Sequence, residues 1–514
     1  NLNGRRRERR KTPADHAGRW VPALKGVCVD PTGFLCVAPS CVGVGESFPL
    51  KVKVLGPVRP IACSGNWNDP KPALRGPFNL NVDRKIQYHD NCLPEWRGAL
   101  EVDGEGRLTG NRDLVFDGVH QGTFPGDSRP IRVFDGFSFA EPGIHFIRLV
   151  DEKSGVEGWS NPVNVTPEPP RSRIYWGDPH WQTFFSDGIR CPEELYAFAR
   201  DEGFLDFGAI TDHMEGVTDR QWDYFQAVTN DYNRPGRFVT LIGQEWTNHN
   251  PAAGAPGHRN IYYRQSAGPV LRSNASDCDT LEKLWKKLDS ISRVDSIAIP
   301  HHSANVIMGV DWEQGWNPKY EKAVEIHSVW GNSERSREDG NPMAIQHLNG
   351  EIRGRHVVDA LRKGFRLGFV GGGDIHDGRP GDALHQESYP PFPTRFWPEG
   401  FTAVTVPVLT REAVFDAMRD HATYATTQSR IYLDVRAKPT RNGLTVAVTA
   451  ASEEGVVEAS IVANGCDVAA LRSDDDPRVL RDRKTTVNVD PGGFCYVRII
   501  TDRGNMAWSS PVWV

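Results

Sequence analysis

The central half of the chain, residues 171–430, alternates short apolar segments with amphipathic ones. The segment "PEELYAFARDEG" predicts a helix, because Pro192 suits the first helical turn, two glutamates follow it, and Gly203 ends the pattern. The apolar run "DFGAI" follows at once and predicts a buried strand. Strands such as "SIAIP" and "LGFVG" and helices such as "TLEKLWKKLDSI", "VVDALRKG" and "TREAVFDAMRDH" repeat this order. The alternation predicts an α/β domain with a parallel sheet, either a barrel or an open doubly wound sheet.

The segments on either side of this region have a different pattern. Up to residue 170, β-prone runs such as "SFPLKVKVLG" and "IHFIRLVD" are broken by Gly, Pro, Asn and Asp, which predicts a β-sandwich-like module. An alternating run near the other end, "GFCYVRIIT", predicts a second one. A chain of 514 residues is long enough for two or three separate cores. We therefore expect a β-rich domain at 1–170 that begins with a basic disordered arm, a central domain at 171–430, and a β-rich domain at 431–514.

Charge and composition exclude several partners. The 60 Lys+Arg and 66 Asp+Glu give a formal net charge of −6, so no overall positive field attracts nucleic acid or an anionic membrane. No apolar stretch approaches the roughly 20 residues of a membrane-spanning helix. The nine cysteines contain no CxxC pair, which favours a reduced, cytoplasmic protein. Because the numbering starts at Asn1 rather than a methionine, this expectation leaves export open, and the oligomeric state is open too.

Histidines and carboxylates follow the predicted strands of the central domain. They are Asp212 and His213 in "AITDH", Glu245 in "LIGQEW", His301 and His302 in "AIPHH", and Asp374 and His376 in "FVGGGDIHDG". In a parallel barrel the carboxyl ends of the strands converge on one face, so these side chains would share a cavity. Histidine nitrogen with carboxylate oxygen suits Zn, Mn or Fe, and such ions activate water for ester hydrolysis. The residues therefore predict a metal-dependent hydrolase.

The successive motifs also resemble a known family. "GDPHWQTFFSDG", "AITDH", "IGQEW", "IPHH" and "GGGDIHDGRPG" are similar, in order and spacing, to the motifs of the PHP superfamily, named for polymerase and histidinol phosphatase. More narrowly, "GHRNIYY", "SVWGNSE", "ATYATTQSRI" and "AWSSPVWV" resemble a large uncharacterised PHP-like group with flanking β domains. The resemblance implies a distorted (β/α)7 TIM-like barrel between β-sandwich-like domains. It also implies a phosphoesterase-type hydrolysis with two or three divalent metal ions.

Ligands carried over from the resemblance fall into three sets. The first metal would be bound by His180, Glu245 and Asp374, with Gln182 where a histidine is usual; the second by Glu245, His301 or His302, and His327; the third by Asp187, His213 and His376. The assignment of His327 is the weakest, because Glu325 and Glu334 are credible substitutes. Among catalytic candidates, His258 and Arg259 of "GHRN" would steady negative charge on the substrate. His213 or His376 would shuttle protons if the third metal is absent.

Gln182 departs from the family pattern. Its amide oxygen can ligate a metal, but it is a neutral, weak ligand without the imidazole nitrogen that zinc or iron prefers. Three outcomes follow from the departure: a complete site with a weaker first metal, a site reduced to one or two metals, or an inactive site. Aromatic residues near the motifs favour a sugar-like or bulky organic small molecule. We expect a phosphoester; the alternatives are a carboxylic ester, amide or glycan-linked group, or a non-catalytic carbohydrate-binding scaffold.

Overall fold

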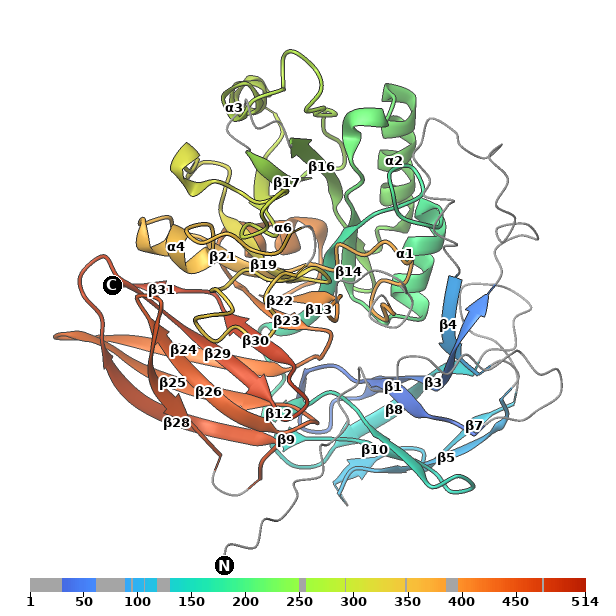
Figure 1. The fold of residues 1–514 in the computed structure, drawn as a ribbon. Helices are drawn as coiled ribbons and strands as arrows, with labels where there is room; N and C mark the ends of the chain where they lie inside the picture. The colour runs from blue at the N-terminus through green and yellow to red at the C-terminus, as the bar shows by residue number, and fades with distance from the viewer. Residues whose placement is uncertain are drawn as a thin grey trace, which may run out of the picture.

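A computed structural model gives the fold of the chain. It describes residues 30–61, 88–93, 96–105, 107–117, 130–248, 256–291, 293–346, 349–384, 396–473 and 476–514. Strands make up 43% of the structure and helices 13%. The predicted basic arm lies outside the described residues. Figure 1 shows the N-terminal sheets (blue to cyan) and the C-terminal sheets (red) side by side at the foot of the central region.

The N-terminal strands form three sheets around one core. The first contains β1 (Gly33–Val37), β3 (Phe48–Ile61), β4 (Tyr88–Cys92), β6 (Leu108–Thr109) and β8 (Ile131–Phe139); the second β5 (Gly98–Asp103), β7 (Asp113–Phe116), β10 (Arg148–Asp151) and β11 (Val156–Trp159); the third β2 (Cys41–Gly43), β9 (Gly143–His145) and β12 (Val163–Thr166). Alternate residues of β3, Leu50, Val52 and Val54, are fully buried in this core, as the period of a half-buried strand requires.

The central strands belong to three further sheets. They are β13 (Arg173–Trp181), β14 (Phe207–Ile210), β15 (Val239–Thr240), β22 (Gly400–Val406) and β23 (Thr423–Thr427) in a ten-stranded sheet; β16 (Ile242–Asn248), β17 (Gly257–Tyr263) and β18 (Ser296–Pro300) in a second; and β19 (Ala323–Ser328), β20 (Gly331–Asn332) and β21 (Gly368–Gly371) in a third. The ten-stranded sheet and the sheet of β19, β20 and β21 contain both parallel and antiparallel pairs. The sheet of β16, β17 and β18 is antiparallel throughout.

The predicted (β/α)7 TIM-like barrel is wrong. Strand β13 pairs in parallel with β14 but in antiparallel with β22, and β16 and β17 are antiparallel neighbours in register from Ile242 to Asn248. A closed barrel needs each strand to be followed by a crossover helix and a parallel neighbour. The β16–β17–β18 run breaks that rule, because β17 follows β16 without a described helix between them. The described strands form a β-rich assembly of separate sheets.

The C-terminal strands join the central sheet. Strands β26 (Val456–Ala463), β27 (Cys466–Leu471), β29 (Phe494–Thr501), β30 (Met506–Ser509) and β31 (Val512–Trp513) complete the ten-stranded sheet, while β24 (Tyr432–Thr440), β25 (Gly443–Ala451) and β28 (Val479–Asn488) form a separate one. Strand β30 pairs with β23, so one sheet and one large core extend across residue 430. The expected domain boundaries remain predictions.

Five α-helices lie within the described residues. They are α1 (Pro192–Asp201), α2 (Asp219–Tyr232), α3 (Leu281–Ser290), α4 (Val357–Arg362) and α6 (Arg411–Arg419), with 3-10 turns at Met214–Gly216 and Trp312–Gln314. The sequence predicted α1, α3, α4 and α6. Helix α2 was not predicted; it begins at a capping box, in which Thr218 Oγ1 accepts from the N–H of Gln221. None of the described helices is long and apolar enough to cross a membrane.

Candidate metal centre

Strand ends from different sheets meet at one buried place. His180 lies near the end of β13, Glu245 on β16 and His258 on β17, while His301 directly follows β18 and Asp374 follows β21. Isolated backbone bridges tie these ends together, between Trp181 and Ile375 and between His213 and Glu245. The predicted convergence of polar strand ends therefore occurs without a barrel.

Glu245 is the hub of the cluster. Its Oε1 lies 2.6 Å from Nδ1 of His258 and 3.0 Å from Nε2 of His301. Its Oε2 lies 3.4 Å from Nδ1 of His213 and 3.5 Å from Nε2 of His180. Burial opposes a charge here, yet the surrounding imidazoles hold the pKa of Glu245 well below its usual range. One ionised carboxylate thus contacts four histidines.

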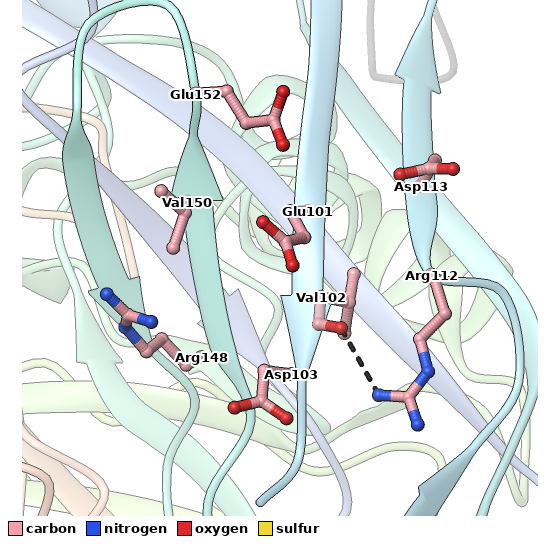
Figure 2. A pocket seen from close by; sticks show the side chains of 8 residues that line it. All are labelled: Glu101, Val102, Asp103, Arg112, Asp113, Arg148, Val150 and Glu152. Atoms are coloured by element: carbon pink, nitrogen blue, oxygen red, sulfur yellow. Dashed lines mark hydrogen bonds between the residues drawn. The ribbon is translucent and has the colours of Figure 1, made fainter. Parts of the chain in front are cut away.

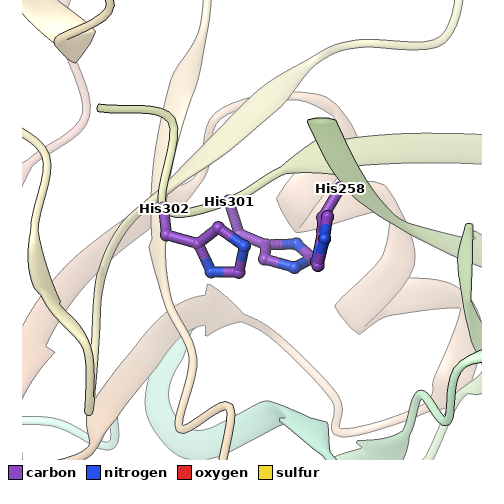
Figure 3. Close-up of side chains that lie close together, drawn as sticks. All are labelled: His258, His301 and His302. Atoms are coloured by element: carbon purple, nitrogen blue, oxygen red, sulfur yellow. The ribbon is translucent and has the colours of Figure 1, made fainter. Parts of the chain in front are cut away.

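Three overlapping groups of side chains have the spacing of metal ligands. They are His258, His301 and His302; His180, His301 and Asp374; and His213, Glu245 and His258. In each group one possible ligand atom per residue lies within 4.8 Å of the others. Figure 3 shows the imidazole rings of the first group turned toward one another. Such spacing allows each group to surround one cation.

Two of these imidazoles have the protonation state that a metal requires. Burial holds the pKa of His258 well below its usual range. Burial and the neighbouring His301 lower the pKa of His302 to about 4. Both rings are therefore neutral near pH 7, as a ligating imidazole must be. Within the described residues, Nε2 of His302 and Nδ1 of His301 make no hydrogen bond although both rings are buried. A cation would supply partners for these atoms, so the donor set fits a divalent metal.

Asp374 and His180 are held by neighbours on both sides. Nε2 of His180 lies 3.2 Å from Oδ1 of Asp374, and Nδ1 of His180 lies 2.9 Å from Oε2 of Glu325. The indole N–H of Trp330 donates to Oδ2 of Asp374. A carboxylate behind a histidine fixes its tautomer and orients the opposite nitrogen, as in many metal sites. Glu325 therefore orients His180 from behind, rather than taking the place of His327.

Three predicted residues form the exposed edge of the centre. Oδ1 of Asp187 lies 3.3 Å from Nε2 of His376 and 3.7 Å from Nε2 of His213. Their side chains are 44%, 12% and 26% exposed, respectively, whereas the imidazoles and carboxylates behind them are buried. Burial opposes their charge, yet nearby carboxylates raise the pKa of both His213 and His376 to about 9. This edge is the part of the cluster that is exposed to solvent.

Two predicted residues lie outside the cluster. His327 places Nε2 2.9 Å from the carbonyl of Pro398 and stacks on Trp508, because the pairing of β19 shifts register between Glu325 and His327 and redirects the side chain. Arg259 lies opposite Trp246 in the β16–β17 ladder, whereas Glu245 lies opposite Asn260. Since alternate residues face opposite sides of a strand, Arg259 points away and its Nε lies 2.7 Å from Glu321.

Other side chains were assigned differently or missed. His258, predicted to be catalytic, belongs to two of the three ligand groups. Glu334 accepts hydrogen bonds from Tyr496, Arg498 and Trp508 and is a structural hub. Thr247, whose Oγ1 lies 2.7 Å from Nδ1 of His213, was missed. The strand period could have found it, because it lies two residues after Glu245 on the same face.

Gln182 lies inside the cluster. Its side chain is fully buried and its amide nitrogen contacts Glu245 at 2.6 Å. Gln182 therefore lies beside Glu245, with which the resemblance grouped it, and the group that it presents to this carboxylate is an N–H donor.

A concave site lies in the N-terminal region. A cavity of about 410 Å³ on the β5–β7–β10–β11 sheet is lined by Glu101, Val102, Asp103, Arg112, Asp113, Arg148, Val150 and Glu152. Figure 2 shows Arg112 turned toward the carbonyl of Val102, to which it donates at 3.3 Å. Arg148 pairs with Glu157. The cavity is acidic and open, and no aromatic side chain lines it.

Fold and site together define a β-rich protein of several sheets with a buried cluster of histidines and carboxylates. A family described as "Protein of unknown function (DUF3604)" matches residues 193–334. Similar chains include uncharacterised proteins of Chlamydia trachomatis serovar D, Chlamydia muridarum and Chlamydia pneumoniae, at 26%, 27% and 27% identity. Each alignment covers 73% of this chain and 63% of the relative, so the chain spans less than two thirds of these proteins. No solved structure matches.

Proposed function

We propose that the chain is a metal-dependent hydrolase whose centre holds two or three divalent ions. The observation that carries this proposal is the buried set of three overlapping ligand groups, which share His258 and His301. Structural metal sites are closed, but catalytic sites keep access to solvent. Here Asp187, His213 and His376 form a partly exposed edge, which suits a catalytic site. The resemblance to the PHP superfamily agrees with this function and stays a prediction.

Side chains of the chain would have separate tasks in hydrolysis. When bound, divalent ions lower the pKa of a water and polarise an ester. His258, His301 and His302 would hold one ion, and His180 and Asp374 would contribute to another. Thr247 orients His213 through its Nδ1 and leaves Nε2 facing the exposed edge. Where no third ion binds, the raised pKa of His213 and His376, about 9, keeps both rings charged near pH 7, so Nε2 of either would give a proton to the leaving group.

The preferred substrate is a phosphoester of a small organic or sugar-like molecule. An ester or amide of a carboxylic acid is the second candidate, and the position of Arg259 favours it. A phosphate carries charge that an arginine would offset, but Arg259 is engaged by Glu321 on the other face of the strand. A neutral acyl group needs no such partner.

Turnover of two chromogenic substrates tests the proposal. Protein supplied with Mn²⁺ or Zn²⁺ should release p-nitrophenol from p-nitrophenyl phosphate, or from p-nitrophenyl acetate if the second candidate holds. Asp374→Asn should reduce either rate by at least about a hundredfold, since removing even an outer partner of a metal site costs about 10–100-fold. Asparagine suits this position because Asp374 has a φ of +48°, a conformation that asparagine tolerates. Equal rates for both proteins, or no turnover of either substrate with metal bound, would contradict the proposal.

A further inference from the structure

The side-chain amide of Gln182 is fixed between two acceptors. Its Nε2 lies 3.1 Å from the carbonyl oxygen of Thr211 and 2.6 Å from Oε2 of Glu245. A backbone carbonyl only accepts hydrogen bonds, so the amide atom facing Thr211 is the nitrogen. The amide oxygen points elsewhere, to Oγ of Ser186 at 2.7 Å. The orientation of the amide is thus determined by its surroundings.

This orientation makes the two oxygens of Glu245 unequal. Oε2 accepts an N–H from Gln182, and a lone pair used in that bond is not offered to a cation. Oε1 accepts a longer bond, from Oγ1 of Thr247 at 3.2 Å, and faces the imidazoles of His258 and His301, whose group also includes His302. Glu245 therefore presents one oxygen to the three-histidine group and keeps the other engaged by an amide.

The same orientation of the Gln182 amide weakens cation binding at the neighbouring position, beside His180 and Asp374. Nε2 of His180 lies 3.2 Å from Asp374 and 3.5 Å from Oε2 of Glu245, which marks a second place for a cation. Gln182 turns the positive end of its amide dipole toward Oε2 at this place. A cation there would meet N–H hydrogens where an imidazole would offer a lone pair.

We infer that Gln182 is a positioning residue and not a metal ligand. It holds Oε2 of Glu245, so that a metal bound by His258, His301 and His302 is retained while the His180–Asp374 position is the weaker one. This inference rests on the proposed function, because it concerns the same metal centre. Of the three outcomes open for Gln182, it favours a complete site whose first metal is bound more weakly, so that dialysis removes this metal from the wild type.

Metal content per chain tests the inference without relying on activity. Wild type, Gln182→Leu and Gln182→His are loaded with Mn²⁺ or Zn²⁺, dialysed against metal-free buffer, and measured by elemental mass spectrometry. Gln182→Leu should keep the wild-type content, because a side chain that is not a ligand removes no metal when replaced. Gln182→His should gain about one equivalent, because it brings a nitrogen ligand to the His180–Asp374 position. Loss of an equivalent in Gln182→Leu, or no gain in Gln182→His, would overturn the inference.

Gln244 provides a matched control. It is a buried glutamine next to Glu245, but its Nε2 lies 2.9 Å from Tyr263 and 2.8 Å from the carbonyl of Pro269, outside the cluster. Gln244→Leu should leave the metal content unchanged. If Gln182→His fails to fold, as its circular dichroism would show, Gln182→Leu decides the question. A wild type without any metal would reject the proposed function itself, whereas a loaded wild type with unresponsive Gln182 variants would reject only the inference.

Discussion

His302 and Asp374 hold their backbones in the left-handed region, with φ of +32° and +48°. Residues other than glycine adopt this region at a cost on the order of 1–3 kcal/mol, and such residues gather at functional sites. Both belong to the ligand groups, and both are buried. Backbone strain at two members of the candidate groups is consistent with the proposed cation binding.

The stability of the fold should depend on pH through His356, a histidine outside the centre. Burial opposes the charge of His356, but Asp359 and Glu351 outweigh it and raise its pKa to about 9. Nε2 of His356 lies 3.1 Å from Glu351. In the unfolded chain its pKa is about 6.5, so the charged ring stabilises the fold by up to about 3 kcal/mol. This stabilisation is complete below about pH 6.5 and is lost as the pH rises through about 9.

Thermal midpoints of the wild type and His356→Gln, measured from pH 6 to pH 10, check this sign. The thermal midpoint of the wild type should exceed that of the variant by the largest amount at pH 6, and this difference in midpoint should shrink toward pH 10. A difference that stays constant across this range would show that the charge of His356 contributes nothing.

Most cluster residues could be predicted from the sequence, because a histidine or carboxylate directly after an apolar strand must lie at that strand's end. His301 and Asp374 follow this rule, whereas His180 and Glu245 lie within β13 and β16 and were located by the motif resemblance. His327 does not follow the rule, because a register shift that no local pattern reveals turns it away. The side chain of Arg259 points to the opposite face of the sheet from that of Glu245. The sequence alone could not show this, because it depends on the register of β16 with β17.

The glycine turn after β21 positions Asp374 in the cluster. A Cβ on Gly372 would lie 2.0 Å from Oε2 of Glu325 and 2.9 Å from Cβ of His180. A Cβ on Gly373 would lie 2.2 Å from Oδ2 of Asp178. The triple glycine therefore allows β21 to approach β13 and β19 closely enough for Asp374 to reach His180.

Gly372→Ala should disturb the centre. The added methyl group displaces Glu325 and His180, and forcing extra atoms into a packed core costs about 1–3 kcal/mol. We expect a lower thermal midpoint and a lower metal content than in wild type. Gly33→Ala is the control, because no atom lies within 4 Å of the corresponding Cβ position. If the two variants behave alike, close packing at Gly372 is not important for the centre.

The helices and strands were more predictable than their assembly. Amphipathic periods and N-terminal signals located α1, α3, α4 and α6 correctly. Helix α2 went unpredicted, although its Thr218 and Gln221 form a capping box. The barrel was predicted because strand and helix segments alternate along the chain as they do in a parallel α/β sheet. This alternation does not specify which strands pair with each other. Partners such as β22 and β23, distant in sequence, pair in antiparallel beside β13 and decide the topology.

At the scale of the whole molecule, a buried ion pair network connects the N-terminal sheets to the central region. Nζ of Lys53 on β3 lies 3.3 Å from Glu202, which follows α1, and 3.1 Å from Asp382. The side chain of Lys53 is fully buried. Apolar contacts join the N-terminal and C-terminal sheets as well, through Cys41, Phe146 and Tyr432. The flanking sheets are therefore packed onto the rest of the chain rather than tethered to it.

Lys53→Met should weaken this connection. Removing one partner of a buried ion pair typically costs about 3–5 kcal/mol. Asp382 keeps its ion pair with Arg379, so we expect a cost at the lower end of this range. The thermal midpoint should fall well below that of Lys283→Met. Lys283 pairs with Asp279 on the surface, where such pairs contribute only about 0–1 kcal/mol. Equal midpoints for the two variants would show that the Lys53 network does not stabilise the packing of the N-terminal sheets on the central region.

The proposed function requires the histidine and carboxylate cluster to bind divalent metal. Anomalous X-ray diffraction at the metal absorption edge, from crystals grown with Mn²⁺ or Zn²⁺, would locate bound ions. We expect an anomalous peak within bonding distance of the ring nitrogens of His258, His301 and His302. A well-ordered cluster without any anomalous peak, at metal concentrations that saturate ordinary metalloenzymes, would contradict it.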